Sequence, residues 1–183
     1  MFIWTNKSEI SEIDKNTMPE YFPDVLTDIV ESDPNLEVYT FISPGGDEKI
    51  ITSYRLYCDG HRIARILADD GITAGDVVIL SFDHGYDLVA TFWGALFLGA
   101  LPTIYPYFPK SNATNVYLNK LKHVASATGV KAVIAPLRLD DSIQPVFNDS
   151  DCRAVFLPPM KDSHSDQFEK FESLGPYGEV AFM

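Results

Sequence analysis

The hydrophobic pattern of the chain centres on one long run with a single charge at its start. The run DLVATFWGALFLGALPTIYPYFP extends from Asp87 to Pro109, and the next charge is Lys110. From Leu88 onward the run is long enough in principle to cross a bilayer. Two structures therefore have to be weighed: a membrane span, and a segment buried inside a globular protein.

Glycine and proline divide this run into two shorter elements. Gly99 suits the end of a helix, and Pro102 is costly inside one. The pattern predicts a helix over about Tyr86–Leu98 and a strand over Leu101–Tyr105. This helix is too short for a hydrocarbon core, and no basic cluster flanks it. Because apolar side chains lie nearly all round it, we expect burial on most sides. These side chains are Leu88, Val89, Phe92, Trp93, Leu96 and Phe97.

The segment before this helix has the pattern of a central parallel strand. GDVVILSF, Gly75–Phe82, is a continuous apolar and β-branched run, typical of a strand buried on both faces. The turn DHGYD then leads into the helix. Strand, helix and strand in this order predict a βαβ unit whose helix covers a sheet.

The remaining pattern alternates helices and strands around this unit. EVYTFISPGGDEKIITSY predicts a hairpin with a Gly-Gly turn. The alternation predicts an α/β fold, a doubly wound, mostly parallel sheet with flanking helices, preceded by this β-hairpin. We divide the chain into a polar N-terminal segment, 1–18, and an α/β domain, 19–183. Further expected elements are helices at 22–31, 53–71 and about 111–129, strands at 131–136 and 152–159, a weak helix at 140–151 that Pro145 breaks, a polar loop at 159–176 and the opening of a strand at 178–183.

Charge and cysteine content narrow the expected partners and compartment. A formal net charge of −12 repels nucleic-acid phosphates and anionic membrane surfaces, so we expect neither as a partner. Cys58 and Cys152 lie far apart and form no CxxC pair, so common zinc and redox motifs are absent. The opening MFIWTNKSEI lacks the basic and apolar segments of a secretion signal. These features together predict a cytoplasmic protein.

Candidate site residues follow the predicted strands, where ligands gather in open α/β sheets. His84 and Tyr86 come directly after the central strand, and Tyr105 and Tyr107 come at the end of the next one. We predict that His84, Tyr86 and Tyr105 line a substrate pocket. The competing interpretation is structural, with acidic neighbours at the helix N-terminus and tyrosines packed in the core. No GxSxG, HExxH, GxGxxG or Walker motif occurs, so no catalytic, cofactor-binding or metal-binding residue is predicted.

In their order and spacing, several segments resemble one family. TSYRLYCDGHRIARILADDGITAGDVVILSF resembles the opening block of adenylate-forming enzymes, with its Tyr-x-x-Leu, Ala-x-x-Leu and Gly-Asp-x-Val series. FWGALFLGALPTIYPYFP is similar to their next block, an aromatic-glycine helix followed by Gly-Ala and an apolar strand. The resemblance covers roughly 19–183. Its Pro-containing loop is most similar to the fatty acyl branch, which includes fatty acyl-AMP ligases and acyl-CoA synthetases.

The resemblance implies a two-step ligase reaction in the parent protein. A carboxylic acid, in this branch a fatty acid, attacks the α-phosphorus of ATP, and acyl-AMP and pyrophosphate result, with Mg²⁺ as the cofactor. Coenzyme A (CoA) or an acyl carrier protein then takes the acyl group. The chain departs from the family pattern at Ser53, where Thr is commoner, and at DHGYD, where a Pro- or Asn-containing turn is usual.

A further departure is that no Ser/Thr/Gly-rich phosphate loop follows EVAFM. We therefore expect a truncated part of a larger N-terminal domain, cut before the phosphate loop, inactive alone and binding no ATP or metal. A sheet without its neighbouring strands leaves an open edge, so we also expect self-association. Two alternatives stay open: a stand-alone α/β binding or interaction domain without catalysis, and a membrane-associated protein that uses the Leu88–Tyr105 run.

Overall fold

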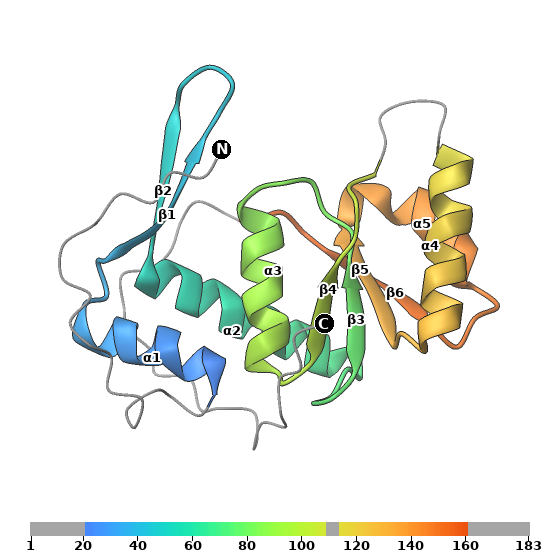
Figure 1. Cartoon of the computed structure of the whole chain (residues 1–183), viewed down its shortest axis with the longest axis horizontal. Helices are drawn as coiled ribbons and strands as arrows, with labels where there is room; N and C mark the ends of the chain where they lie inside the picture. Colours follow the sequence, from blue (N-terminus) through green and yellow to red (C-terminus); the bar gives the residue numbers. More distant parts are fainter. Residues whose placement is uncertain (1–20, 109–113, 161–183) are drawn as a thin grey trace.

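The computed structural model describes residues 21–108 and 114–160, and its architecture is the predicted α/β fold (Figure 1). The expected N-terminal segment, most of the polar loop and the strand opening at 178–183 lie outside these residues. In chain order the elements are α1 (Phe22–Ser32), β1 (Glu37–Ile42), β2 (Glu48–Thr52), α2 (Ser53–Asp69), β3 (Val77–Leu80), α3 (Tyr86–Phe97), β4 (Leu101–Ile104), α4 (Thr114–Thr128), β5 (Ala132–Pro136), the 3₁₀ helix η1 (Leu137–Leu139), α5 (Asp140–Phe147) and β6 (Arg153–Leu157).

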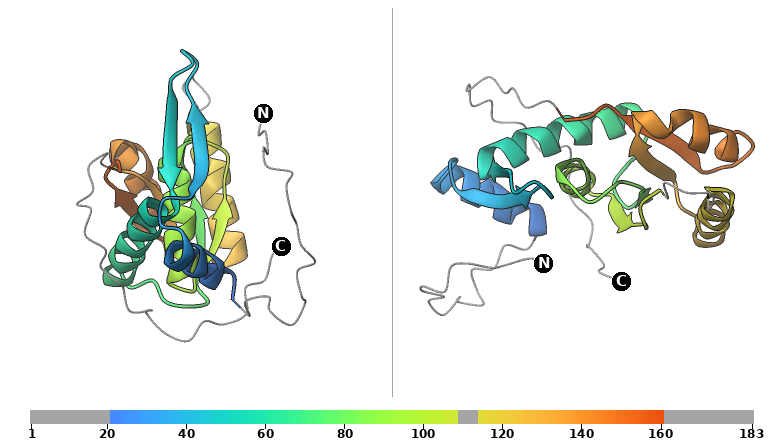
Figure 2. Two further views of the ribbon diagram at one scale, coloured as in Figure 1. Left: turned by 90° about the vertical axis from the view of Figure 1, so that its left-hand side faces the viewer. Right: turned by 90° about the horizontal axis from the view of Figure 1, so that it is seen from above.

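The main sheet is parallel and has helices on both faces, as predicted. Its strand order is β4-β3-β5-β6, and every neighbouring pair is parallel. Side chains of β3 alternate between the two faces: Val78 and Leu80 pack with α2 and α3, whereas Ile79 packs with α4 and α5. Figure 2 shows the helices on either side of the sheet, with β1 and β2 forming a separate antiparallel hairpin. This layering gives the chain two apolar cores that share one sheet.

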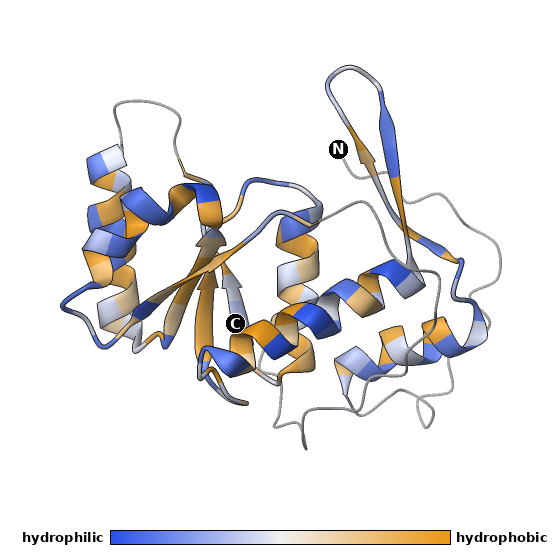
Figure 3. Ribbon diagram, turned by 180° about the vertical axis from the view of Figure 1, so that it is seen from behind, coloured by the Kyte–Doolittle hydropathy of each residue, from blue (hydrophilic) through white to orange (hydrophobic). Residues whose placement is uncertain are grey.

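The long hydrophobic run is two elements, as predicted: the largely buried helix α3 and the strand β4, whose last two residues are exposed. Helix α3 ends at Phe97 and strand β4 begins at Leu101, and Trp93 and Leu96 are buried. Figure 3 shows the strands of the parallel sheet as largely hydrophobic ribbons and the outer helices as striped ones. Within residues 21–108 and 114–160, no helix has the length and apolar character that a bilayer crossing requires. The run is accounted for by the interior of the α/β unit.

The expected break at Pro145 is wrong. Helix α5 continues from Asp140 to Phe147 with Pro145 inside it. Proline removes one hydrogen bond to the preceding turn. Ile143 and Phe147 are nevertheless almost completely buried against the sheet. Tertiary packing of this apolar face therefore outweighs the local preference of proline.

Two glycines set the distance between α2 and α3. A Cβ atom on Gly94 would lie 2.6 Å from Ile63 Cβ and 3.0 Å from the Gly60 carbonyl oxygen. A Cβ atom on Gly60 would lie 2.7 Å from the Phe97 ring. Real Cβ atoms do not approach this closely, so the two helices cross at a contact that only glycine permits.

Replacing Gly94 by alanine is expected to lower the free energy of unfolding by about 1 to 2 kcal/mol. Alanine is favoured over glycine inside a helix by about 1 kcal/mol, but the forced separation of α2 and α3 outweighs that gain. Urea unfolding followed by circular dichroism measures the difference. Gly85→Ala is the control, because Gly85 has extended backbone and open space around its Cβ position. A stability equal to or above that of the wild type would show that the helices can separate at no cost.

Candidate functional site

The carboxyl ends of three neighbouring strands meet at the upper end of the sheet in Figure 1. Arg138 Nη2 lies 2.7 Å from Asp83 Oδ2, so the segments that follow β5 and β3 are joined directly. Both side chains are about half exposed, so water screens the pair and its contribution to stability is small. Its effect is to orient the two segments. We call this end of the sheet the carboxyl edge.

His84 and Tyr107 bring together the segments that follow β3 and β4. Their rings meet edge to face, with centroids 6.1 Å apart. His84 is exposed and Tyr107 is 53% exposed. The contact therefore forms at the surface of the carboxyl edge, where a ligand can reach both rings. Ile104 and Leu137 are also more than half exposed nearby, at the ends of β4 and β5, which gives the edge an apolar character.

Tyr105 lies beside this surface in a half-buried position. Its ring meets Tyr117 edge to face with centroids 5.5 Å apart, and Phe108 contacts the same ring at 5.1 Å. Burial raises the pKa of the Tyr105 phenol, so the side chain stays neutral. Tyr105 thus presents a neutral aromatic side chain that a ring cluster holds in place.

Tyr117 is the anchor of this aromatic cluster, and the sequence analysis did not select it. Its hydroxyl donates to the Pro106 carbonyl at 2.9 Å and lies 2.6 Å from Ser81 Oγ. Burial raises the pKa of this phenol. From helical spacing in the sequence, the apolar face of this helix would be Val116, Leu118, Leu121 and Val124. In the structure Val116 is exposed and Leu118 and Val124 are only partly buried, and the buried face is Tyr117, Leu121 and Ala125. The four-residue spacing of these three positions is the signal that would have identified Tyr117.

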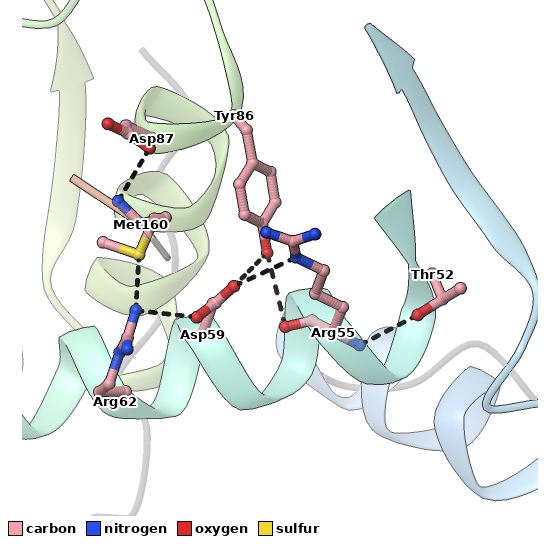
Figure 4. A network of polar contacts seen from close by, with 7 residues as sticks. All are labelled: Thr52, Arg55, Asp59, Arg62, Tyr86, Asp87 and Met160. Carbon is pink, nitrogen blue, oxygen red and sulfur yellow. Dashed lines mark hydrogen bonds and ion pairs between the residues drawn. The ribbon is translucent and has the colours of Figure 1, made fainter. Parts of the chain in front are cut away.

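Tyr86 lies apart from the other two candidates, in the polar network of Figure 4. It is only 5% exposed, and its hydroxyl donates to Asp59 Oδ2 at 2.6 Å. Burial, followed by the hydrogen bond to Asp59, raises the pKa of the phenol. The guanidinium carbon of Arg55 lies 5.0 Å from the Tyr86 ring centroid. The structure therefore brings His84 close to Tyr107, and Tyr105 to Tyr117, but directs Tyr86 toward α2.

The same network reaches the segment that leaves β6. Asp59 is completely buried, and its Oδ1 atom accepts from Arg62 Nη2 at 2.9 Å. Arg62 also contacts the Met160 sulfur at 2.9 Å, and the Met160 amide donates to Asp87 Oδ1 at 3.3 Å. One buried carboxylate on α2 thus links the first turn of α3 with the chain beyond β6 (Figure 4).

In the described part of the chain, no group of three or more His, Cys, Asp and Glu side chains is placed to hold a metal ion. The carboxyl edge contributes aromatic rings, one hydroxyl pair and one exposed ion pair. This set of groups suits contact with an apolar or aromatic ligand better than chemistry on a phosphate.

Comparison with curated proteins gives distant relatives of much greater length, and no family model matches the chain. Disco-interacting protein 2 of Drosophila melanogaster is 32% identical over 122 residues, which is 65% of this chain and 7% of the relative. Disco-interacting protein 2 homolog A of Mus musculus is 26% identical over 162 residues, 78% of this chain and 11% of the relative. The chain therefore spans about a tenth of these relatives or less.

Solved structures with the same fold are adenylate-forming ligases. A fatty acid AMP ligase from Legionella pneumophila superposes with a TM-score of 0.67 at 20% identity, over 80% of this chain and 25% of the other. The adenylation domain of a keto acid-selecting NRPS module gives 0.63 at 22% identity, over 77% and 27%. A benzoate CoA ligase from Burkholderia xenovorans gives 0.58 at 19% identity, over 75% and 26%. The chain thus has the fold of about one quarter of an adenylate-forming ligase, and the fold that the sequence resemblance implied is confirmed.

Proposed function

We propose that this chain is part of a protein that activates a carboxylic acid with ATP. The carboxylate oxygen bonds to the α-phosphorus, the bond to the β-phosphate oxygen breaks, and acyl-AMP and pyrophosphate form. The observation that carries the proposal is the fold shared with the Legionella pneumophila fatty acid AMP ligase. A related ligase from the same organism is described in complex with acyl adenylate and pyrophosphate. The parent protein would need Mg²⁺ or another cation to neutralise the phosphates.

In this proposal, the carboxyl edge forms one wall of the acyl-binding site. His84 and Tyr105 contact the acid, as the sequence pattern suggested, and Tyr107 adds a third ring. Tyr86 acts indirectly, because its hydroxyl is held by Asp59 and its position fixes the segment that carries His84. A fatty acid suits the exposed apolar side chains of Ile104 and Leu137.

The acceptor of the acyl group is proposed to be CoA or a carrier protein. Both kinds of acceptor are represented among structures of the same fold, by the benzoate CoA ligase and by an A-PCP structure bound to phenylalanyl-adenylate. We place the reaction in the cytoplasm, where Cys58 and Cys152 would stay reduced.

Pyrophosphate exchange into ATP tests the activity in the full-length protein encoded by the gene. Exchange should depend on an added acid, with long-chain fatty acids compared against benzoate and a keto acid. Tyr105→Ala should raise the KM for the acid about tenfold, because one aromatic contact is lost. His123→Ala, at an exposed position on α4, is the control. Absence of exchange with every acid, from a folded full-length protein, would refute the proposal.

The second candidate function is a non-catalytic α/β interaction domain. The observation that favours it is the name of the Drosophila melanogaster relative, Disco-interacting protein 2. On this alternative the full-length protein shows no acid-dependent exchange, and substitutions at the exposed carboxyl edge weaken binding to a protein partner instead. Exchange activity that Tyr105→Ala reduces would exclude it as the sole function.

A further inference from the structure

The two outer strands of the main sheet differ in how their free edges are built. In the order β4-β3-β5-β6, β4 and β6 are the outer strands, and Figure 2 shows them at opposite margins. In a strand, the N–H and C=O groups of alternate residues point to opposite sides. The groups that do not face the neighbouring strand therefore decide whether a further strand can join.

The β4 edge is closed by prolines. The N–H groups of Leu101 and Tyr105 donate to Asp76 and Leu80, toward β3. By alternation, the backbone of residues 102, 104 and 106 points away from the sheet. Two of these are Pro102 and Pro106, which have no N–H group, so only one donor stands on this edge. Proline on an edge strand is a known protection against strand addition.

The β6 edge is open. The N–H of Arg153 donates to Lys131 at 3.2 Å, so the odd-numbered residues of β6 face β5. Ala154 and Phe156 therefore present both N–H and C=O outward. Within the described residues, neither N–H group has a partner outside the sheet. The outward residues inside β6, Ala154 and Phe156, carry no charge, and Pro158, the next residue to point outward, lies just past the strand; protected edges commonly carry lysine, proline or a bulge within the strand itself.

We propose that a second copy of this chain pairs with β6. Antiparallel pairing about a twofold axis at Val155 sets Ala154 of each copy opposite Phe156 of the other. Each such pair exchanges both of its N–H and C=O hydrogen bonds, so the outward groups of both residues are satisfied at once. The two parallel sheets then form one continuous sheet across the axis.

The strand is self-complementary in charge as well as in hydrogen bonding. The twofold axis places the two Arg153 side chains at opposite ends of the paired segment, so they do not repel each other. Val155 is buried on the face that α2 and α3 cover, and half-buried Phe156 lies across from the small Ala154 on the face that α4 and α5 cover. The net charge of −12 on each copy opposes association, so added salt should strengthen the dimer. Because pairing of two strands gives a small interface, we expect a dissociation constant on the order of 100 μM.

Proline substitutions on the two edges test this proposal in the full chain. Ala154→Pro removes an outward N–H of β6 and leaves the bonds to β5 intact, since these use Arg153 and Val155. It should weaken dimerisation about thirtyfold, because two hydrogen bonds per dimer are lost. Ile104→Pro makes the same change on the β4 edge and should leave dimerisation unchanged. Circular dichroism establishes that both variants are folded, and sedimentation from about 10 μM to about 1 mM measures association.

Amide hydrogen exchange identifies the pairing strand and keeps the proposal open to refutation. The amides of Ala154 and Phe156 should become protected as the concentration of the wild type rises, while that of Ile104 stays fast. A monomer at every concentration, with fast exchange at Ala154 and Phe156, would overturn the proposal. Protection of these amides in a monomer would overturn it too, because another segment of the polypeptide would then occupy the edge.

Discussion

Replacing Asp59 by alanine is expected to lower the free energy of unfolding by about 4 kcal/mol. Asp59 has no exposed surface, and its carboxylate accepts from Tyr86 and Arg62. Its Oδ2 atom also lies 3.8 Å from Nε of Arg55, a side chain that is only 17% exposed. Without the carboxylate, a largely buried guanidinium loses its counter-charge and a buried phenol loses its acceptor. Arg62 contributes less, because it is 45% exposed and water screens its charge.

Urea unfolding of three variants separates the parts of this effect. Asp69→Ala changes the same residue type on the same helix at an exposed position, and should alter stability by less than about 0.5 kcal/mol. Tyr86→Phe removes only the hydroxyl and should cost about 1 kcal/mol. The double variant Asp59→Ala with Tyr86→Phe should cost less than the sum of the two, because the residues share one hydrogen bond. A cost of 1 kcal/mol or less for Asp59→Ala would mean that water replaces the carboxylate.

The Asp59 network connects the stability of the fold to the proposed site. Tyr86 is the first residue of α3, and His84 lies two residues before it at the carboxyl edge. Met160, three residues after the end of β6, donates its backbone N–H to Asp87 in the same first turn of α3. A single buried group on α2 therefore holds segments that lie far apart in the sequence. Loss of the Asp59 carboxylate is therefore expected to shift the residues of the carboxyl edge. It would not remove a direct contact with a ligand.

The sequence pattern was sufficient for the elements of the fold and for their order. The continuous apolar run at β3 is typical of a strand buried on both faces, and Gly99 with Pro102 separated α3 from β4. These signals lie within short stretches of sequence, so they identify the elements without knowledge of the tertiary structure. The ends of elements were less well defined: the strand expected at Gly75–Phe82 is Val77–Leu80 in the structure.

What the sequence did not provide depends on contacts between distant residues. Asp59 and Tyr86 are 27 positions apart, and Ser81 and Tyr117 are 36 apart, so no spacing rule joins them. The proximity of His84, Tyr86 and Tyr105 was inferred from strand ends alone. His84 and Tyr105 follow the ends of β3 and β4 and lie at the carboxyl edge, whereas the direction of a side chain in the first turn of a helix depends on how that helix is rotated about its axis. Tyr86 consequently points toward α2, where its hydroxyl finds the Asp59 carboxylate.

Acidification is expected to destabilise the protein through His61, and His61→Phe should remove that part of the effect. His61 is 7% exposed and stacks on Phe97, with ring centroids 4.1 Å apart. Burial, with a smaller contribution from the charge of Arg65, lowers the pKa of His61 from 6.5 to about 4. The folded state therefore favours the neutral ring, so its stabilising contribution is complete above pH 6.5 and is lost as the pH falls toward 4.

Between pH 7 and pH 5, this linkage predicts that the wild type loses about 2 kcal/mol relative to His61→Phe. Phenylalanine keeps an aromatic ring against Phe97 but takes up no proton, so the difference between the two curves isolates His61 from the many carboxylates that also titrate. Urea unfolding of both proteins at each pH measures that difference. His123→Phe, at an exposed position on α4, controls for the loss of a histidine. Parallel curves for wild type and His61→Phe would show that the ring accepts a proton without leaving its site, and that the contact of α2 with α3 tolerates a buried charge.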